Sequence, residues 1–225
     1  MPATPSTRPA RCSTGSSRTG SDSQLLLRQP EQHQFYILPI LYRFWYSIGM
    51  TYYNDIYEHA VDRHYLFTTL DAQELGIPVI ELTKLAHRGR LEALGNGVYR
   101  LARNVPSESD PYAVAVARAG EGAFLYGESV IALLSLAPTN PEVINVGTTR
   151  RVRKAFPEEV NLVRVKDAGK LTVYEGIACQ RAKDAIAACR GAVMPERLKA
   201  AAVRGVEQGY ITAREAEELE GEMGW

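Results

Sequence analysis

The sequence predicts an α+β protein, in which an N-terminal winged helix-turn-helix precedes a mixed α/β domain with a helical C-terminal end. Two capped, amphipathic helices meet at Gly76, and a hairpin with a glycine-rich turn follows them. After a polar, proline-containing linker the periodicity changes to short strands alternating with helices. We therefore predict an extension over residues 1–50, a winged helix over 51–103, a linker over 104–111 and the α/β domain over 112–225.

The winged helix is predicted to begin with a helix over residues 51–63, with Ile56 and Ala60 facing the core. A second helix begins at Thr68, which is an N-cap residue with the carboxylate of Asp71 three positions later, a variant of the capping box. Three apolar residues of this region are spaced to pack inward, namely Leu70, Leu75 and Ile77.

Gly76 then stands where a helix-turn-helix needs a residue that tolerates positive φ, and Pro78 suits the first turn of the next helix. In that helix Leu82 and Leu85 continue the apolar stripe of Ile77. The opposite side carries Val79, Thr83, Lys84, His87 and Arg88. Gly89 ends the helix, and the hairpin follows with strands over 90–94 and 98–101 around Gly95-Asn96-Gly97.

In this arrangement the helix that follows Gly76 enters the major groove of duplex DNA, and the wing lies along the backbone or the minor groove. The predicted DNA-binding residues are therefore Thr83, Lys84, His87, Arg88, Arg90, Asn96 and Arg100. A solvated basic face without a target is the alternative. One winged helix covers few base pairs, so dimerisation on DNA, or two bound copies, is expected.

Charge gives this prediction little support. The chain has 26 basic and 26 acidic residues, and residues 52–104 have six Lys/Arg against seven Asp/Glu. DNA binding would thus rest on local clusters. The densest positive run supplies Arg150, Arg151, Arg153 and Lys154. It is a candidate contact to nucleic acid, and its alternative is a solvated loop.

In the α/β domain, helices are predicted over residues 112–119 and 129–136, and strands over 142–148, 160–166 and 171–174. Helices over 180–190 and 194–208 follow, and Thr212 with Glu215 forms a capping box for a last, acidic helix. Arg181 and Asp184 have the spacing of an ion pair within one helix.

Residues 1–50 differ from the rest of the chain. The first 23 residues are rich in Ser, Thr, Pro, Gly and Arg, and an apolar run without a regular period comes later. Three interpretations are open: an arm whose arginines contact DNA phosphates, an apolar segment that covers another domain, or an over-extended reading frame whose natural start is Met50. We assign this extension no function.

Catalytic and metal-binding patterns are missing from the sequence. The four histidines all precede the α/β domain, and Cys12, Cys179 and Cys189 have no metal-ligand spacing, so buried thiols are expected. The glycines match no phosphate-binding loop. No apolar run reaches the ~18 residues of a membrane span. We therefore predict a binding protein rather than an enzyme, without cofactor, metal or membrane.

The last predicted helix of the winged helix and its wing read LTKLAHRGRLEALGNGVYR over residues 82–100, with an RG-x-L-x-x-L-G-x-G-V-Y-R pattern. With this pattern as the most specific piece, the chain resembles the AbiEi family of antitoxins over about residues 52–219. GAFLYGESVIALLSL (122–136) is similar to the buried helix of the family, which begins at a serine, here Ser129. INVGTTRRVRK (144–154) and VNLVRV (160–165) are similar to its strands and the basic stretch between them.

The resemblance implies a cytoplasmic antitoxin of a type IV toxin–antitoxin system. Such a protein binds inverted repeats in the promoter of its own operon, represses that operon, and counteracts a nucleotidyltransferase toxin of the AbiEii type, without needing a stable complex. The resemblance also makes the toxin a candidate partner for the basic stretch with Arg150, Arg151, Arg153 and Lys154. The alternative is a stand-alone winged-helix transcriptional regulator whose C-terminal domain dimerises or senses a ligand. A third hypothesis is an enzyme of a different fold.

Overall fold

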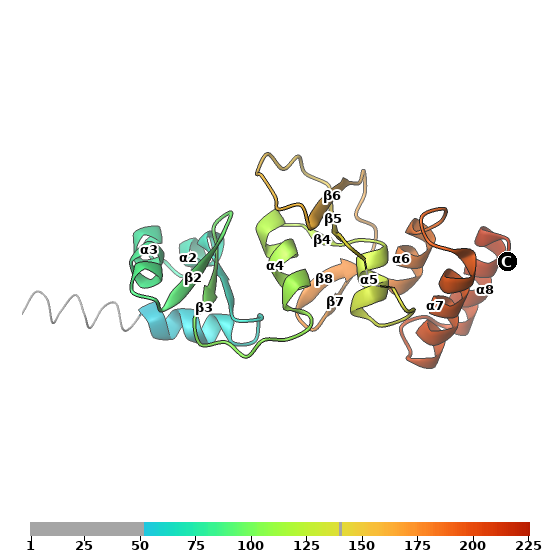
Figure 1. Ribbon diagram of the computed structural model, residues 1–225, viewed down its shortest axis with the longest axis horizontal. Helices are drawn as coiled ribbons and strands as arrows, with labels where there is room; N and C mark the ends of the chain where they lie inside the picture. The colour runs from blue at the N-terminus through green and yellow to red at the C-terminus, as the bar shows by residue number, and fades with distance from the viewer. Residues whose placement is uncertain (1–51, 140) are drawn as a thin grey trace, which may run out of the picture. The chain divides into compact units, whose positions relative to one another are not determined.

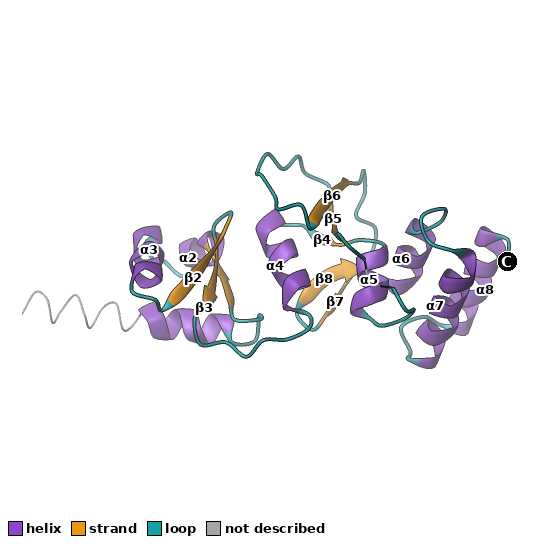
Figure 2. Ribbon diagram, in the orientation of Figure 1, coloured by secondary structure: helices purple, strands orange, loops and turns teal. Residues whose placement is uncertain are grey.

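The computed structural model describes residues 52–139 and 141–225, and these residues form helices and two β-sheets (Figures 1 and 2). The predicted mixture of α and β structure with helices at the C-terminal end is confirmed. The predicted extension over residues 1–50 lies outside the described residues. The predicted domain boundaries stay predictions.

The first sheet lies among three helices. After a helix over residues 52–60 come β1 (Leu66–Thr68), α2 (Thr69–Glu74), α3 (Val79–His87), β2 (Leu91–Gly95) and β3 (Val98–Leu101). Both strand pairs are antiparallel, in the order β1-β3-β2. Thr68 caps α2 in a capping box with Asp71, and Gly76 has φ of 67°, as the sequence predicts.

A small core holds the helices onto one face of this sheet. It consists of Ile56, Ala60, Phe67, Ala72, Ile77, Leu82, Leu85, Leu91 and Leu101. The prediction that Leu70 and Leu75 pack inward is wrong, because these side chains are 44% and 46% exposed. Helix α2 has only six residues, ends at the C-cap Leu75 and buries Ala72, so the chain has turned before it buries Ile77.

The other face of the same sheet belongs to a second core. Strand β1 places Phe67 with the helices and its neighbour Leu66 on the opposite side, as the alternation of a strand requires. Leu66 and Val98 join a cluster that includes Ala113 of α4 (Asp110–Ala119). The three-stranded sheet therefore separates two apolar cores.

The second sheet has five strands in the order β6-β5-β4-β8-β7. They are β4 (Phe124–Leu125), β5 (Ile144–Thr148), β6 (Val160–Arg164), β7 (Leu171–Tyr174) and β8 (Ile177–Gln180). The pairs β5–β6 and β4–β8 are parallel, whereas β4–β5 and β7–β8 are antiparallel. Helix α4 lies on one side of the sheet, and α5 (Glu128–Leu133) lies on the other (Figure 1).

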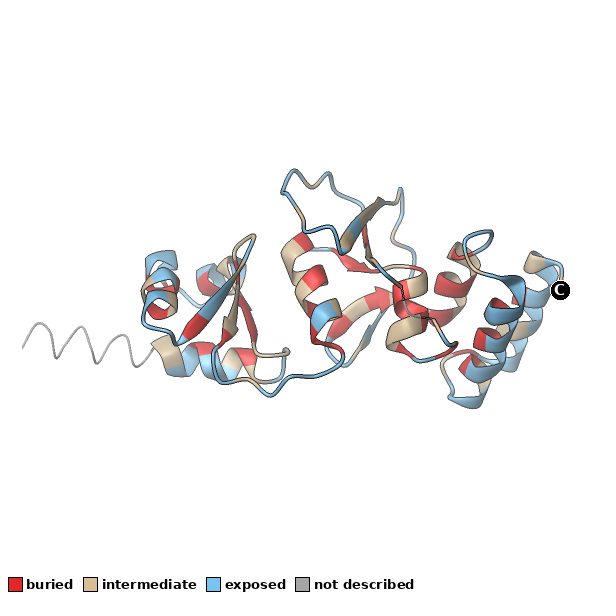
Figure 3. Ribbon diagram, viewed as in Figure 1, coloured by how far each residue is buried: buried red, intermediate tan, exposed pale blue. Residues whose placement is uncertain are grey.

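Strands β4 and β8 are not anticipated in the sequence. Both residues of the central strand β4 are fully buried, in keeping with cover on both faces (Figure 3). Gly147 of β5 lies opposite Phe124, and a Cβ at this position would come within 2.5 Å of the phenyl ring. The glycine thus lets the aromatic ring lie against the neighbouring strand.

Three helices complete the chain: α6 (Ala182–Ala188), α7 (Pro195–Glu207) and α8 (Ala213–Met223). The predicted capping box of Thr212 and Glu215 at the start of α8 is confirmed. The predicted ion pair of Arg181 with Asp184 is wrong, since Arg181 precedes α6 as its N-cap and its guanidinium contacts Glu215 of α8 instead. A contact between helices thus replaces the local pair.

Candidate nucleic-acid interface

Helix α3 presents one apolar and one polar side, as the sequence predicts. Leu82 and Leu85 are buried in the core, while Thr83, His87 and Arg88 are exposed. Pro78 is the N-cap of the helix, one position earlier than predicted, and Arg88 is its C-cap. The exposed residues lie in the last two turns, so any groove contact through them involves this end of the helix.

Lys84 has an acidic neighbour on the same helix. Its ammonium group lies 2.7 Å from Oε1 of Glu81, one turn earlier, and the Glu81 side chain is mostly buried. A phosphate that approaches Lys84 would compete with this carboxylate. Glu81 therefore lowers the positive charge that the helix presents, and its i,i+3 spacing from Lys84 is the sequence signal for this pair.

The basic residues of the hairpin also have partners. Arg100 makes two hydrogen bonds across the strands to Glu92, at 3.1 and 2.6 Å. The guanidinium of Arg90 lies 5.1 Å from the ring centre of Tyr53, over the helix of residues 52–60. These contacts fix both side chains on the hairpin, but they also leave less of their charge for a ligand.

The structure brings the turn between β2 and β3 to the basic stretch of residues 150–154. The Asn96 side-chain amide donates to the carbonyl of Ala155 at 3.1 Å, and the Lys154 ammonium donates to the Asn96 carbonyl at 3.1 Å. Arg118 of α4 adds a hydrogen bond to the carbonyl of Leu94. The two parts are about sixty residues apart in sequence, so the pattern of either one gives no sign of this contact.

Within the basic stretch the four cations differ. Arg150 pairs with Glu121 at 2.9 Å, and Lys154 donates to the carbonyl of Asn96 in the turn between β2 and β3. Arg151 and Arg153 are exposed. The exposed Arg151 and Arg153 are thus carried on a loop that hydrogen bonds with the turn between β2 and β3.

The thiols have the buried environment that the sequence predicts for Cys179 and Cys189. Burial raises the pKa of Cys179 to about 11 and that of Cys189 to about 12, so both stay protonated at neutral pH. Cys12 lies outside the described residues. Within residues 52–139 and 141–225 no three His, Cys, Asp or Glu side chains are grouped as metal ligands would be.

Residues 54–102 match the model of a family of transcriptional regulators. That family is described as "Transcriptional regulator, AbiEi antitoxin", so the resemblance found in the sequence is confirmed for this segment. The match spans the helix over residues 52–60 almost completely, and β1 to β3.

Among solved structures, the chain is similar to the RV2827C protein from Mycobacterium tuberculosis, with a TM-score of 0.43 and 17% sequence identity. The likeness covers 74% of this chain and 69% of that protein. No curated protein matches the chain. In the part of the chain that the structure describes, no helix has the length and apolar character needed to cross a membrane.

Proposed function

We propose that the protein is the antitoxin of a type IV toxin–antitoxin system, which represses its own operon and counteracts a nucleotidyltransferase toxin. In this proposal residues 51–103 are a winged helix-turn-helix that binds duplex DNA at inverted repeats in the promoter. The single observation that carries the proposal is the family match over residues 54–102, on a segment whose third helix has an exposed polar side.

The end of α3 supplies the base contacts in this proposal. Thr83, His87 and Arg88 are exposed over successive turns, and an arginine there is suited to a bidentate contact with guanine in the major groove. Lys84 would contact a phosphate in exchange for Glu81. Phosphate contacts position the protein, whereas contacts to base edges select the sequence.

The wing and the basic stretch supply the backbone contacts. Because Asn96 and Lys154 hydrogen bond with each other's loops, Arg151 and Arg153 accompany the wing turn. We assign these two arginines to phosphates flanking the site that α3 reads. Two copies on an inverted repeat would place their helices about 34 Å apart, one turn of the double helix.

A gel-shift titration with the DNA upstream of the gene tests the proposed surface. Arg88→Ala is expected to weaken binding at least about tenfold, by loss of one base or phosphate contact. Glu81→Gln should strengthen binding, since it removes the carboxylate from Lys84. Lys199→Ala, which changes an exposed lysine of α7, is the matched control and should bind as the wild type does.

Salt dependence adds a second measure to the same titration. Each phosphate contact steepens the slope of log K against log salt by about 0.9, so Arg151→Ala with Arg153→Ala should reduce the slope by about 1.8. Equal binding by the wild type and Arg88→Ala would exclude the α3 surface. An unchanged slope would exclude the basic stretch but leave α3 in place.

The toxin-directed part of the proposal assigns antagonism to residues 112–225 and needs neither catalysis nor a cofactor. We propose a cytoplasmic binding protein, not an enzyme. The proposal places a nucleotidyltransferase toxin gene beside this one, and co-expression of this chain with that toxin should restore growth. A chain with Arg88→Ala should still restore growth when it is expressed from an independent promoter. Growth arrest despite soluble wild-type protein would exclude the antitoxin role.

A further inference from the structure

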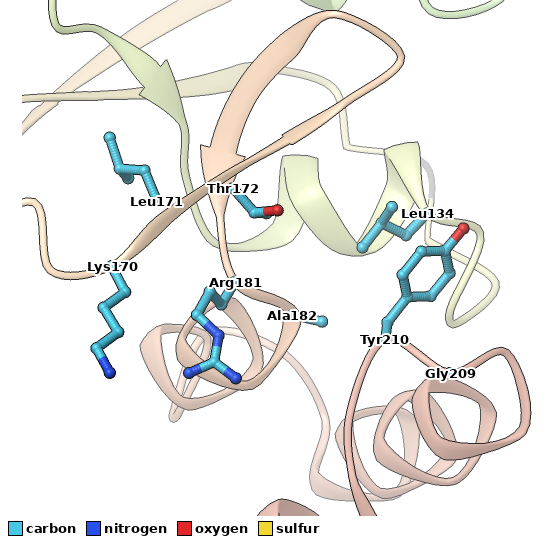
Figure 4. A pocket seen from close by; sticks show the side chains of 8 residues that line it. All are labelled: Leu134, Lys170, Leu171, Thr172, Arg181, Ala182, Gly209 and Tyr210. Carbon is cyan, nitrogen blue, oxygen red and sulfur yellow. The ribbon is translucent and has the colours of Figure 1, made fainter.

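A cavity of about 660 Å³ lies between the edge of the five-stranded sheet and the C-terminal helices. Its walls come from the end of α5, the start of β7, the start of α6 and the turn between α7 and α8 (Figure 4). The volume is within the range of about 300–1,000 Å³ that is typical of sites for small molecules. The cavity is far in sequence from α3, and neither the family match nor the proposed function uses it.

The two ends of the cavity differ in chemistry. Lys170 and Arg181 extend toward the same side, while the ring of Tyr210 lies across the cavity beside Leu134 (Figure 4). The Thr172 side chain lies between these ends. A ligand that fills the space would therefore have an anionic group at one end and a flat, largely apolar group at the other.

Arg181 is held in place at the cationic end. Its guanidinium forms an ion pair with Glu215 of α8, and only one of its terminal nitrogens makes this contact. Hydrogen bonds from the backbone N–H and hydroxyl of Thr212, with Arg181 adding to them, lower the pKa of Glu215 to about 2, so the pair stays ionised. The remaining guanidinium donors can bind an anion. Lys170 leaves this end with a net positive charge, because Glu215 offsets Arg181.

Tyr210 is fixed at the other end. Its ring packs edge-to-face against Tyr174, with ring centres 5.6 Å apart and an angle of 78° between the planes. The hydrogen bond with Tyr174 and burial raise the pKa of Tyr210 to about 12, so the ring is uncharged at neutral pH. An uncharged aromatic ring held in this way offers a surface on which a nucleobase can stack.

We propose that this cavity binds a nucleoside monophosphate, with its phosphate at Lys170 and Arg181 and its base on Tyr210. Thr172 lies where it can hydrogen bond with the sugar. A phosphate is the anion that suits this end, since an arginine with a lysine is a common pair for binding its oxygens. The ligand would connect β7, α6 and the turn before α8, which are brought together only by the fold.

Isothermal titration of the full chain with each of the four ribonucleoside 5′-monophosphates tests this site. At least one should bind, and inorganic phosphate and the corresponding nucleoside should each bind at least about tenfold more weakly, because each makes only one of the two contacts. Lys170→Gln should weaken nucleotide binding about tenfold, by loss of a hydrogen bond to a charged group. Lys199→Gln is the matched control outside the cavity and should bind as the wild type does.

Two variants at Tyr210 separate the ring from the hydroxyl. Tyr210→Phe keeps the stacking surface and should retain nucleotide binding. Tyr210→Leu should weaken the binding of the nucleotide but not the binding of inorganic phosphate. Lys170 is exposed, so Lys170→Gln should keep the wild-type melting temperature and report on the site alone. Absence of binding by all four nucleotides at millimolar concentration, or equal affinity of wild type and Lys170→Gln, would overturn the proposal. Inorganic phosphate bound as tightly as the nucleotide would overturn it also.

Discussion

The two faces of the three-stranded sheet β1-β3-β2 are covered by different parts of the chain. One face holds the helices that precede and follow β1, all within about fifty residues, and Phe67 lies at the centre of that core. The other face packs against α4 through Leu66 and Val98. The same strands thus stabilise a local unit on one side and attach it to the rest of the protein on the other.

Each face also has a helix whose first turn carries an aspartate, and this aspartate contacts a histidine side chain. Asp71 of α2 accepts from Thr68 and lies 3.2 Å from Nε2 of His59. Asp110 of α4 lies 3.1 Å from Nδ1 of His64, whose Nε2 is 2.6 Å from the carbonyl oxygen of Glu175. The first network joins residues that all lie within the segment 52–101. The second joins His64, which precedes β1, to Asp110 of α4 and to Glu175 in the turn between β7 and β8. An aspartate–histidine contact therefore stabilises the segment 52–101 internally, over a separation of 12 residues, and another joins this segment to α4, over a separation of 46 residues.

The largest expected effect is the loss of unfolding free energy when Phe67, in the core between the sheet and the helices of the segment 52–101, is truncated. Phe67→Ala should cost about 4 kcal/mol, and Leu66→Ala, on the opposite face, about 2.5 kcal/mol. Phe67 is fully buried and Leu66 is 7% exposed. Hydrogen exchange measured by mass spectrometry should then show faster exchange over residues 52–101 for Phe67→Ala, and over β1 and α4 for Leu66→Ala. If both variants accelerated hydrogen exchange equally along the whole described chain, the two faces of the sheet would not stabilise different parts of the protein.

The next effect concerns the contacts by which His64 joins the segment 52–101 to α4 and to the turn between β7 and β8. His64 has φ of 54°, a conformation that asparagine tolerates, so His64→Asn should keep the backbone but lose the two side-chain hydrogen bonds. We expect a loss of about 1.5 kcal/mol in the free energy of unfolding, because Asp110 is buried. His59→Asn is the matched control, since Asp71 keeps its bonds from Thr68 and Arg63, and its loss should be smaller. A larger loss for His59→Asn would reverse the comparison.

The sequence predicts the local unit better than the second sheet. Caps and turns depend on neighbouring residues, so Thr68, Gly76 and the hairpin could be placed from their spacing. The sequence gives no register for the parallel pairs β5–β6 and β4–β8, and a two-residue strand such as β4 has no period to detect. Contacts with distant partners, such as that between His64 and Glu175, were therefore not foreseen.

The same limit applies to the candidate interface. The exposed side of α3 follows from helical periodicity, which is a property of consecutive residues. The pairing of Lys84 with Glu81 has i,i+3 spacing and could have been predicted, whereas the hydrogen bonds between Asn96 and the loop of residues 150–155 could not. The cavity with Lys170 and Tyr210 is built from four separate elements, and no single motif indicates it.

The smallest expected effect is the pH dependence of the stabilisation by Asp71. Burial alone would raise the pKa of Asp71, but hydrogen bonds from the Thr68 hydroxyl and backbone N–H, together with His59, lower it below the usual 3.8. A carboxylate with a lowered pKa in the folded state stabilises the protein above the unfolded value, and this contribution is lost as the pH falls through the folded value. Asp71→Asn should therefore cost about 1 kcal/mol at pH 7, as loss of a helix cap does.

Unfolding free energies of the wild type and Asp71→Asn, measured from pH 7 to pH 2.5, check this sign. The difference should begin to shrink below pH 3.8 and become smallest at the acid end, since the wild-type carboxyl is then protonated as well. Asp55→Asn, an exposed change in the helix over residues 52–60, should show no such trend. A difference that grew toward acid pH would mean that folding raises, rather than lowers, the pKa of the Asp71 carboxyl.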